Sequence, residues 1–395
     1  MQIRNYRFNR LEFAGSLGDL GTLIPLSVAL MVISGLNVTA VLLVVGIFYI
    51  VTGLYYNLPI PVQPLKVFAA IAIAFPGHIT VPIIMAASIA IGVILLLLAM
   101  TGLINWLAGL FSKPIIRGIQ LGLGLILIAK GIEFIRRPEL FINNSDMFNL
   151  ITGIPLNLVL GLLSVLVVFL LISNKRYPAS LIIVITGIII GVCFGAMKDV
   201  TLHLGPLPLT VFKPTLSDFI DGFILLAFPQ IPLTIGNAII GTADVCKNLF
   251  EKRAEARKVT YKSLTISMGI VNVISGMIGG LPVCHGAGGL AAHYRFGART
   301  GGSNIMIGSL FVLIALVFGH IAISLLSSIP HAILGTLLLF SGLELSMLIR
   351  DVKEKKELFI VLIVAGIGFV TTNMGVAFLI GIILNYIIKW KCIRV

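Results

Sequence analysis

Leu58-Pro-Ile-Pro-Val-Gln-Pro-Leu-Lys66 and Gly280-Leu-Pro-Val-Cys-His-Gly-Ala-Gly-Gly289 are two short polar breaks in an otherwise apolar chain. Both place Pro-Val before a polar pair, and the two Pro-Val steps, at Pro61 and Pro282, lie 221 residues apart. Matching breaks in the two halves of a membrane protein are the best sequence indication of a transport site near the bilayer midplane. Unpaired backbone in hydrocarbon costs several kcal/mol per group, so such breaks persist only where they line a cavity.

The composition around these breaks is that of an integral membrane protein. Of the 395 residues, 58% are apolar and 11% are charged, and the mean hydropathy is +1.11, whereas a soluble domain has about 25% charged residues. Recurrent apolar stretches of about 18 residues or more favour helices over a β-barrel. The net charge of +13 lies in short loops, which favours a topology signal over a nucleic-acid surface. The four cysteines have no CxxC spacing, so no metal site, disulfide framework or cofactor is predicted.

The apolar pattern predicts an all-α polytopic fold of fourteen membrane segments. Their expected ranges are 13–34, 38–56, 64–75, 80–101, 115–134, 156–173, 178–197, 219–246, 264–279, 286–295, 303–326, 331–349, 358–372 and 374–390. The third and tenth segments cover only about half of a 30 Å hydrocarbon core, so each is expected to be a half-helix after an extended run. Seven segments per half predict an inverted repeat. Residues 1–197 form the first half, 198–218 an outside linker, and 219–395 the second half.

The positions of the basic residues agree with this segment count. With a cytoplasmic N-terminus, 22 of the 28 lysines and arginines fall on the inner side. Positively charged loops stay on the cytoplasmic side of a membrane. We therefore predict a multi-pass protein, expected in the plasma membrane, with both termini in the cytoplasm.

The two breaks also predict an anion site. The start of each half-helix leaves backbone N–H groups without intrahelical partners and carries about half a positive charge. Two such helix starts facing each other can bind an anion. Gln63 and His285 can add side-chain donors, Lys66 adds a full positive charge, and the glycines at 286, 288 and 289 let an anion approach the backbone. The alternative is that these glycines only permit tight helix packing.

The first and eighth segments carry further polar groups. Asp19 lies deep in the first segment, where a carboxylate is costly and usually functional. It is expected to carry a coupling proton or to hold Lys66 or a loop, whereas Thr22 is the better donor to an anion. In the eighth segment, one helix face carries Gln230, Thr234 and Asn237. These side chains are expected either to donate hydrogen bonds to an oxyanion or to form contacts between helices. Asp244 and Glu344, near inner helix ends, are expected to be interface charges.

At these residues the sequence resembles the molybdate transporter family related to sulfate permeases. The resemblance rests on Glu12-Phe-Ala-Gly-Ser-Leu-Gly-Asp-Leu-Gly-Thr-Leu-Ile-Pro25, Pro59-Ile-Pro-Val-Gln-Pro-Leu-Lys66, Pro232-Leu-Thr-Ile-Gly-Asn237, Pro282-Val-Cys-His-Gly-Ala-Gly-Gly289 and Tyr294-Arg-Phe-Gly-Ala-Arg-Thr-Gly301. It implies the uracil-permease-like fold of fourteen segments, in which segments three and ten pair as short strands before becoming half-helices. Gln63 and the stretch Cys284-His285-Gly286-Ala287-Gly288 match the motif positions that bind substrate. Only residues 389–395 follow the last segment, so the C-terminal regulatory domain of many sulfate permeases is not expected.

The resulting hypothesis is secondary uptake of a tetrahedral oxyanion. Molybdate is the first candidate, with sulfate and tungstate as close competitors, and no nucleotide-binding motif indicates ATP coupling. A proton gradient is the expected driving force, with Asp19 and His285 as candidate carriers. The chain is expected to contact the lipid bilayer, and whether it forms a homodimer is left open.

Three other functions stay open at this point. A nucleobase or carboxylate permease of the same fold is disfavoured, because nucleobase carriers place a carboxylate on segment eight, where this chain has neutral side chains. An uncoupled anion channel is the second alternative. An intramembrane enzyme using Cys284 and His285 is disfavoured, because adjacent side chains rarely face each other, so the chain is not expected to be an enzyme.

Overall fold

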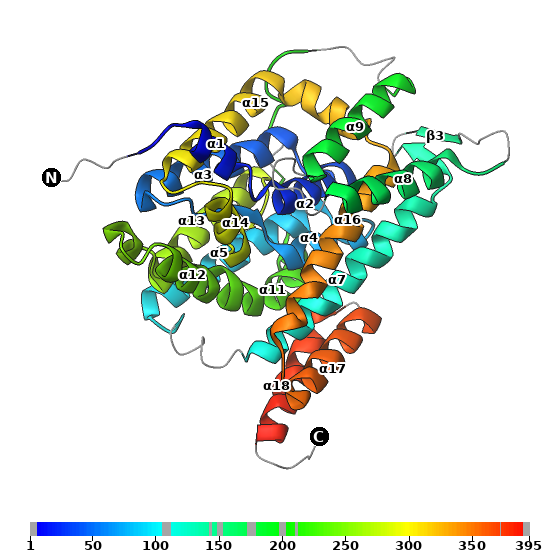
Figure 1. Ribbon diagram of the computed structural model, residues 1–395. Helices are drawn as coiled ribbons and strands as arrows, with labels where there is room; N and C mark the ends of the chain where they lie inside the picture. The colour runs from blue at the N-terminus through cyan, green and yellow to red at the C-terminus, as the bar shows by residue number, and fades with distance from the viewer. Residues whose placement is uncertain are drawn as a thin grey trace.

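A computed structural model gives the fold (Figure 1). It describes residues 6–104, 112–141, 144–147, 153–171, 179–196, 203–209, 212–371 and 373–389. The boundary expected between residues 197 and 198, and the charged residues 175, 176, 198, 391 and 394, lie outside these ranges.

Helices make up most of the described chain. They are α1 (Arg10–Ser16), α2 (Leu20–Ile33), α3 (Val38–Tyr56), α4 (Lys66–Ala74), α5 (Val81–Thr101), α7 (Lys113–Arg136), α8 (Leu156–Leu171), α9 (Ala179–Cys193), α10 (Leu216–Gly222), α11 (Phe228–Leu233), α12 (Thr242–Leu249), α13 (Tyr261–Ile278), α14 (Ala287–Arg295), α15 (Gly302–Ser327), α16 (His331–Ser346), α17 (Lys355–Thr371) and α18 (Met374–Lys389). Two π-helical stretches, η1 (Phe223–Ala227) and η2 (Thr234–Gly241), join α10, α11 and α12 into one helix, and η3 (Ala254–Lys258) and η4 (Met347–Asp351) are 3₁₀ turns. The strands are β1 (Gln63–Pro64), β2 (Glu139–Phe141), β3 (Asn144–Met147) and β4 (Val283–Cys284).

Several of these helices are long and apolar enough to cross a bilayer. In the described part of the chain six qualify alone, namely 38–56, 81–101, 113–136, 216–249, 302–327 and 331–351. The bent pair of α1 and α2 makes a seventh if it is one span. The predicted multi-pass helical fold is therefore confirmed. Each of the fourteen predicted ranges contains a helix, but several of those helices are shorter than a full span, so the fourteen-segment arrangement stays a prediction.

The first predicted segment is not one helix, which corrects the expected range 13–34. Helix α1 ends at Ser16, α2 begins at Leu20, and the two axes differ by 47°. The sequence Gly15-Ser-Leu-Gly-Asp-Leu-Gly21 has a low helix propensity, and aspartate favours helix starts over helix interiors. Asp19 therefore lies at the N-cap of α2, where its carbonyl accepts from the backbone N–H groups of Thr22 and Leu23. The break leaves the Asp19 side chain free to point away from either helix.

The two polar breaks meet as the resemblance implies. Strands β1 and β4 pair antiparallel, with Gln63 opposite Cys284 and Pro64 opposite Val283. The backbone N–H of Leu65 continues the contact to the carbonyl of Pro282, at 2.9 Å. Helix α4 starts directly after β1 and α14 shortly after β4, so two helix N-termini begin near the centre of the molecule.

Buried side chains replace the missing backbone partners around these strands. The Asn272 amide of α13 both donates to the carbonyl of Val283, at 2.8 Å, and accepts from its N–H, at 2.9 Å. In the extended run before β1, Asn304 of α15 donates to the carbonyl of Ile60 at 2.6 Å. Tyr49 of α3 donates to the carbonyl of Val62 at 3.1 Å. Extended backbone is tolerated at this depth because protein groups satisfy it.

Glycine pairs set the closest helix contacts. Helices α3 and α15 touch at Gly46 and Gly308, and α5 and α13 touch at Gly92 and Gly269. Helices α7 and α16 run side by side (Figure 1) and touch at two places, Gly124 with Gly342 and Gly131 with Gly335. In each pair a Cβ on one glycine would lie between 2.5 and 3.1 Å from the carbonyl oxygen of the other. Small residues let membrane helices approach this closely.

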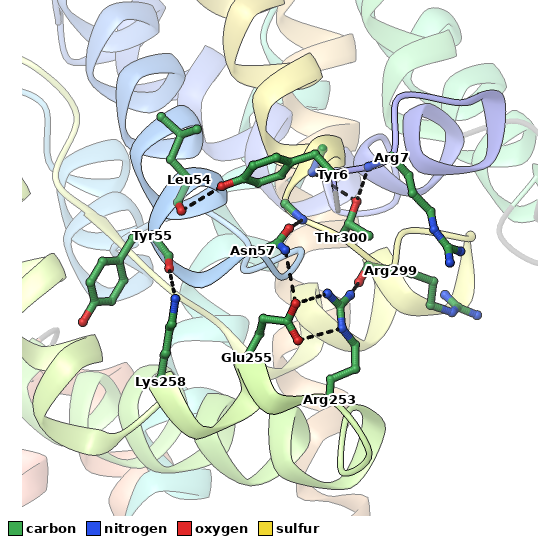
Figure 2. Close-up of polar contacts among 12 residues, drawn as sticks. Tyr6, Arg7, Leu54, Tyr55, Asn57, Arg253, Glu255, Lys258, Arg299 and Thr300 are labelled. Carbon is green, nitrogen blue, oxygen red and sulfur yellow. Dashed lines mark hydrogen bonds and ion pairs between the residues drawn. The ribbon is translucent and has the colours of Figure 1, made fainter. Parts of the chain in front are cut away.

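A polar cluster links the end of α3 to the connections before α13 and α15 (Figure 2). Asn57, which ends α3 with a φ of 50°, accepts from the backbone N–H of Gly301 and donates to the Glu255 carboxylate. Arg253 forms an ion pair with Glu255 at 2.8 Å and donates to the backbone carbonyl of Arg299. Three connections that are far apart in the sequence are therefore held together here.

One sheet was not predicted from the sequence. Strands β2 and β3 form an antiparallel pair between the predicted segments 115–134 and 156–173. Because the pair is short and interrupted, no period-two pattern marks it in the sequence. Among the described residues the fold is thus all-α apart from two small two-stranded sheets.

Candidate functional site

The starts of α4 and α14 open onto a cavity of about 270 Å³. Its walls come from the break before α2, from β1 and α4, from α14 and from α16. The lining residues are Gly18, Asp19, Gly21, Thr22, Leu26, Gln63, Lys66, Leu127, Gly288, Gly289, Ala292, Ser341, Glu344, Leu345 and Leu348. This volume has room for a small anion together with several waters.

Asp19 and Gln63 form the most buried polar contact of the cavity wall. The Gln63 side-chain amide donates to both carboxylate oxygens of Asp19, at 2.7 and 2.9 Å. Asp19 is 3% exposed and Gln63 is 1% exposed. The other end of the amide, Gln63 Oε1, has no hydrogen-bond partner among the described residues. A buried acceptor without a partner is costly, so this oxygen can accept from a group that enters the cavity.

The glycines at the start of α14 make room for this contact. A Cβ at Gly289 would lie 2.6 Å from Asp19 Oδ2 and 2.7 Å from Gln63 Nε2. A Cβ at Gly286 would overlap Gln63 Oε1. Only Gly288 faces open space, with nothing within 4 Å. Gly286 and Gly289 therefore leave room for the Asp19 and Gln63 side chains, whereas Gly288 leaves the backbone accessible from the cavity.

The cavity carries charges of both signs. Lys66, the first residue of α4, supplies a positive charge, whereas Asp19 and Glu344 supply two carboxylates. Glu344 and Ser341 lie on α16, opposite the two half-helices. With both carboxylates ionised the three side chains have a formal charge of −1. The cavity therefore accommodates a dianion less well than its two helix N-termini alone would suggest.

Gln230 and Thr234 act on a half-helix and not on the cavity directly. Gln230 Oε1 accepts from the backbone N–H of Val67, at 2.9 Å, and so caps the first turn of α4. The Gln230 amide then donates to Thr234 Oγ1 at 3.0 Å. Asn237 lies in η2, half-buried, and its carbonyl accepts from the Thr242 hydroxyl. None of the three predicted residues of this helix lines the cavity.

His285 and Cys284 also lie off the cavity. The two ring nitrogens of His285 contact Ser267 Oγ, at 2.9 Å, and the carbonyl of Pro61, at 3.0 Å. The ring stacks on Phe48 with a centroid distance of 5.1 Å. The Cys284 thiol is buried and directed at the carbonyl of Pro64. Both side chains therefore connect the second break to the backbone of the first, at the place where β1 and β4 pair.

The structure thus brings together part of the predicted set. Asp19, Thr22, Gln63, Lys66 and Gly288 line one cavity. The remaining predicted residues do not line it; they are Gln230, Thr234, Asn237, Cys284, His285, Gly286 and Ala287. From the sequence, Glu344 was expected to be an interface charge, and Ser341 was not predicted to be part of the site. The signal for Glu344 was present, because it is a carboxylate within an apolar segment, as Asp19 is.

Comparison with known sequences gives a family. The model of a family described as "Molybdate transporter of MFS superfamily" matches residues 11–127 and 222–345. Molybdate transporter 2 of Arabidopsis thaliana is 33% identical, and the match covers 96% of this chain and 87% of that protein. The family-model match includes the two breaks and the break before α2.

Comparison with solved structures gives the fold. The murine Solute Carrier 26 family member A9 anion transporter, in its inward-facing state, superposes with a TM-score of 0.71, covering 100% of this chain and 70% of that one, at 16% identity. The transmembrane domain of the cyanobacterial bicarbonate transporter BicA superposes with a TM-score of 0.65 over 96% of this chain and 98% of that one, also at 16% identity. The chain therefore shares the overall fold of these two proteins.

Proposed function

The chain belongs to the molybdate transporter family, and from this premise we propose that it is a secondary transporter that takes up molybdate, with sulfate and tungstate as competing tetrahedral oxyanions. The observation that carries the proposal is the cavity of about 270 Å³ at which two half-helix starts, Lys66 and the Thr22 hydroxyl converge. A fixed cluster of donors suits an oxyanion because it needs no rearrangement to bind negative charge.

The start of α14 is the main anion-binding element in this proposal. Its first N–H groups have no intrahelical partner, and at Gly288 no side chain shields them. At the start of α4, by contrast, Gln230 already occupies the N–H of Val67. Lys66 and the Thr22 hydroxyl complete the donors. The α4 helix thus contributes mainly its lysine, while α14 contributes backbone.

We further propose that protons accompany the anion. A second negative charge at about 4 Å costs about 4 kcal/mol at an effective dielectric constant of 20. A molybdate dianion beside ionised Asp19 and Glu344 meets that repulsion twice, and protonation of either carboxylate removes one part of it. Binding of anion and proton then favour each other, which is the requirement for symport. His285 does not line the cavity, so the proposal rests on Asp19, with Glu344 as a second acid.

The architecture that goes with this function is the 7+7 inverted repeat. Its support is the glycine pattern of α7 and α16, where Gly124 and Gly335 are 211 residues apart and so are Gly131 and Gly342. With this offset, Gly124 corresponds to Gly335, and Gly131 corresponds to Gly342. When the two halves are exchanged, the contact of Gly124 with Gly342 therefore becomes the contact of Gly335 with Gly131. The pairing of α3 with α15 and of α5 with α13 follows the same exchange. We propose that the half-helices move against the wall formed by α7 and α16, with both termini cytoplasmic.

Uptake by purified protein in liposomes tests the function. Labelled molybdate is offered outside at acidic and at neutral pH, with a neutral interior, and sulfate, tungstate and uracil are added as competitors. We expect saturable uptake that an inward proton gradient accelerates and that tungstate and sulfate inhibit. Lys66→Gln should reduce it strongly, whereas Lys213→Gln, at an exposed position away from the cavity, should not.

Each other outcome points to a different function. Competition by uracil together with uptake of labelled uracil would identify a nucleobase permease. Non-saturable molybdate flux that ignores the proton gradient would identify a channel. Asp19→Asn separates coupling from binding, because we expect it to remove the acceleration by the proton gradient while molybdate still protects the protein from thermal unfolding.

A further inference from the structure

A second cavity lies between α3 and α13, away from the candidate site. It has a volume of about 620 Å³. Helix α3 packs mainly on α15, and α13 packs mainly on α5, so the two helices touch each other only lightly (Figure 1). Their facing sides therefore leave a groove that faces the membrane, and we call it the α3–α13 groove.

The α3–α13 groove is apolar along most of its length. It runs along α3 from Leu43 to Tyr56 and along α13 from Thr260 to Ile278. These stretches of 14 and 19 residues rise about 20 and 27 Å, which is roughly two thirds to nine tenths of a hydrocarbon core of about 30 Å. Ile47 and Val51 on one rim are 51% exposed, and Ile270 and Ile274 on the other are 49% exposed. The groove is therefore longer than the roughly 15 Å of hydrocarbon in one leaflet, and it can hold the full length of an acyl chain that lies along it.

One end of the groove is cationic. Lys262 lines it together with the hydroxyl groups of Thr260 and Ser263. The Lys258 ammonium lies 3.5 Å from the carbonyl of Tyr55, which also lines the groove (Figure 2). Within the residues described here, neither lysine forms an ion pair with a carboxylate. The nearby Arg253, by contrast, is neutralised by Glu255.

From this polarity we infer that the α3–α13 groove binds one anionic phospholipid. The acyl chains lie between the isoleucine rims, and the phosphate lies between Lys258 and Lys262. A groove with two lysines at one end and hydrocarbon along the rest complements a lipid with net negative charge. A zwitterionic lipid would place its own ammonium group beside the two lysines, which is unfavourable. Lysine side chains near a bilayer surface each contribute about 1 kcal/mol to binding of anionic lipid.

The inner wall of the groove lies next to the crossing of the two strands. Ser267 and Phe48 line the groove, and both contact His285, through the 2.9 Å hydrogen bond and the ring stack respectively. Tyr56, also in the wall, contacts Ser267 at 3.3 Å. A lipid bound here therefore packs against the residues that hold His285 beside β1.

Lipid retention measured by native mass spectrometry tests the inference on the full chain. The protein is extracted from bilayers of phosphatidylcholine with about one fifth phosphatidylglycerol, and lipids that survive mild detergent removal are identified. We expect one phosphatidylglycerol per chain. Lys258→Gln and Lys262→Gln should each lower its retention about fivefold, whereas Lys252→Gln, an exposed lysine outside the groove, should leave it unchanged.

A second pair of variants tests the place of the acyl chain. Ile270→Trp narrows the groove and should reduce retention, and Leu97→Trp, at an equally exposed position of α5, should not. Equal retention by the lysine variants and the wild type would overturn the inference. So would retention of phosphatidylcholine as strong as that of phosphatidylglycerol, or a dimer that only Ile270→Trp dissociates, since a second copy would then cover the groove.

Discussion

Gly289→Ala should destabilise the protein and abolish transport, because the new methyl group falls between Asp19 and Gln63. Its Cβ would lie 2.6 Å from Asp19 Oδ2 and 2.7 Å from Gln63 Nε2, where ordinary contact begins at 3.4 Å. The two groups must move by about 0.8 Å, which breaks the hydrogen bonds of 2.7 and 2.9 Å between them. Loss of a hydrogen bond to a charged group costs about 1.5–3 kcal/mol. Each 1.4 kcal/mol corresponds to a factor of ten, so we expect uptake to fall tenfold or more.

The adjacent glycine provides the matched variant. Gly288→Ala adds the same methyl group to the same helix turn, but no atom lies within 4 Å of it. Alanine is favoured over glycine in a helix by up to about 1 kcal/mol. The two substitutions should therefore change stability in opposite directions, with Gly289→Ala lowering the thermal unfolding midpoint and Gly288→Ala leaving it unchanged or raising it.

The assay is thermal unfolding followed by intrinsic fluorescence in detergent, with molybdate uptake into liposomes measured on the same preparations. Because Gly288 lines the cavity, Gly288→Ala is a control for stability but not for uptake. A Gly289→Ala protein as stable as Gly288→Ala, with normal uptake, would refute the reasoning. The contact between Asp19 and Gln63 would then be unimportant for the fold and for transport.

Three further expectations concern other parts of the molecule. Gln230→Leu leaves the N–H of Val67 uncapped, so we expect a loss of about 1–3 kcal/mol in stability, and an unchanged unfolding midpoint would contradict the cap. Hydrogen bonds from Arg253 hold the pKa of Glu255 below its usual range, so its stabilising effect, at most about 1 kcal/mol, should be complete above about pH 4.3 and be lost as the pH falls through the lowered pKa. Comparing the midpoints of wild type and Glu255→Gln between pH 3 and 7 measures this loss, and a difference that grows toward low pH would contradict it. Gly335→Val drives a side chain into the carbonyl of α7, so little folded protein should be recovered, and a normal yield would disprove the close packing.

Much of the fold was predictable because a bilayer restricts the choices. Helix length is set by membrane thickness, and the two short segments were recognisable from their prolines and glycines alone. The predicted half-helices 64–75 and 286–295 correspond to Lys66–Ala74 and Ala287–Arg295. The break at Asp19 was missed because apolar residues continue on both sides of it, so hydropathy shows one uninterrupted segment.

The site was predictable only in part, because sequence shows which residues are polar but not where they point. Gln63, Lys66 and Asp19 meet as expected. His285 lies in the right segment, yet the pairing of β1 with β4 directs its ring toward Ser267. Glu344 comes from a helix almost 280 residues after Lys66, and only the packing of α16 brings it to the cavity. That packing depends on glycine contacts with α7, which no local pattern reveals.

The pairing of β1 with β4 also constrains how the protein can be made. The partner of Gln63 is Cys284, so the ribosome must add 221 further residues before the first strand can be completed. At about 5–20 residues per second that takes roughly 10–45 s. During this interval β1 has no partner strand, so backbone N–H and C=O groups of the nascent N-terminal part lack their hydrogen-bond partners. Translation arrested before residue 283 would leave such a product permanently, and we expect the cell to recognise and degrade it.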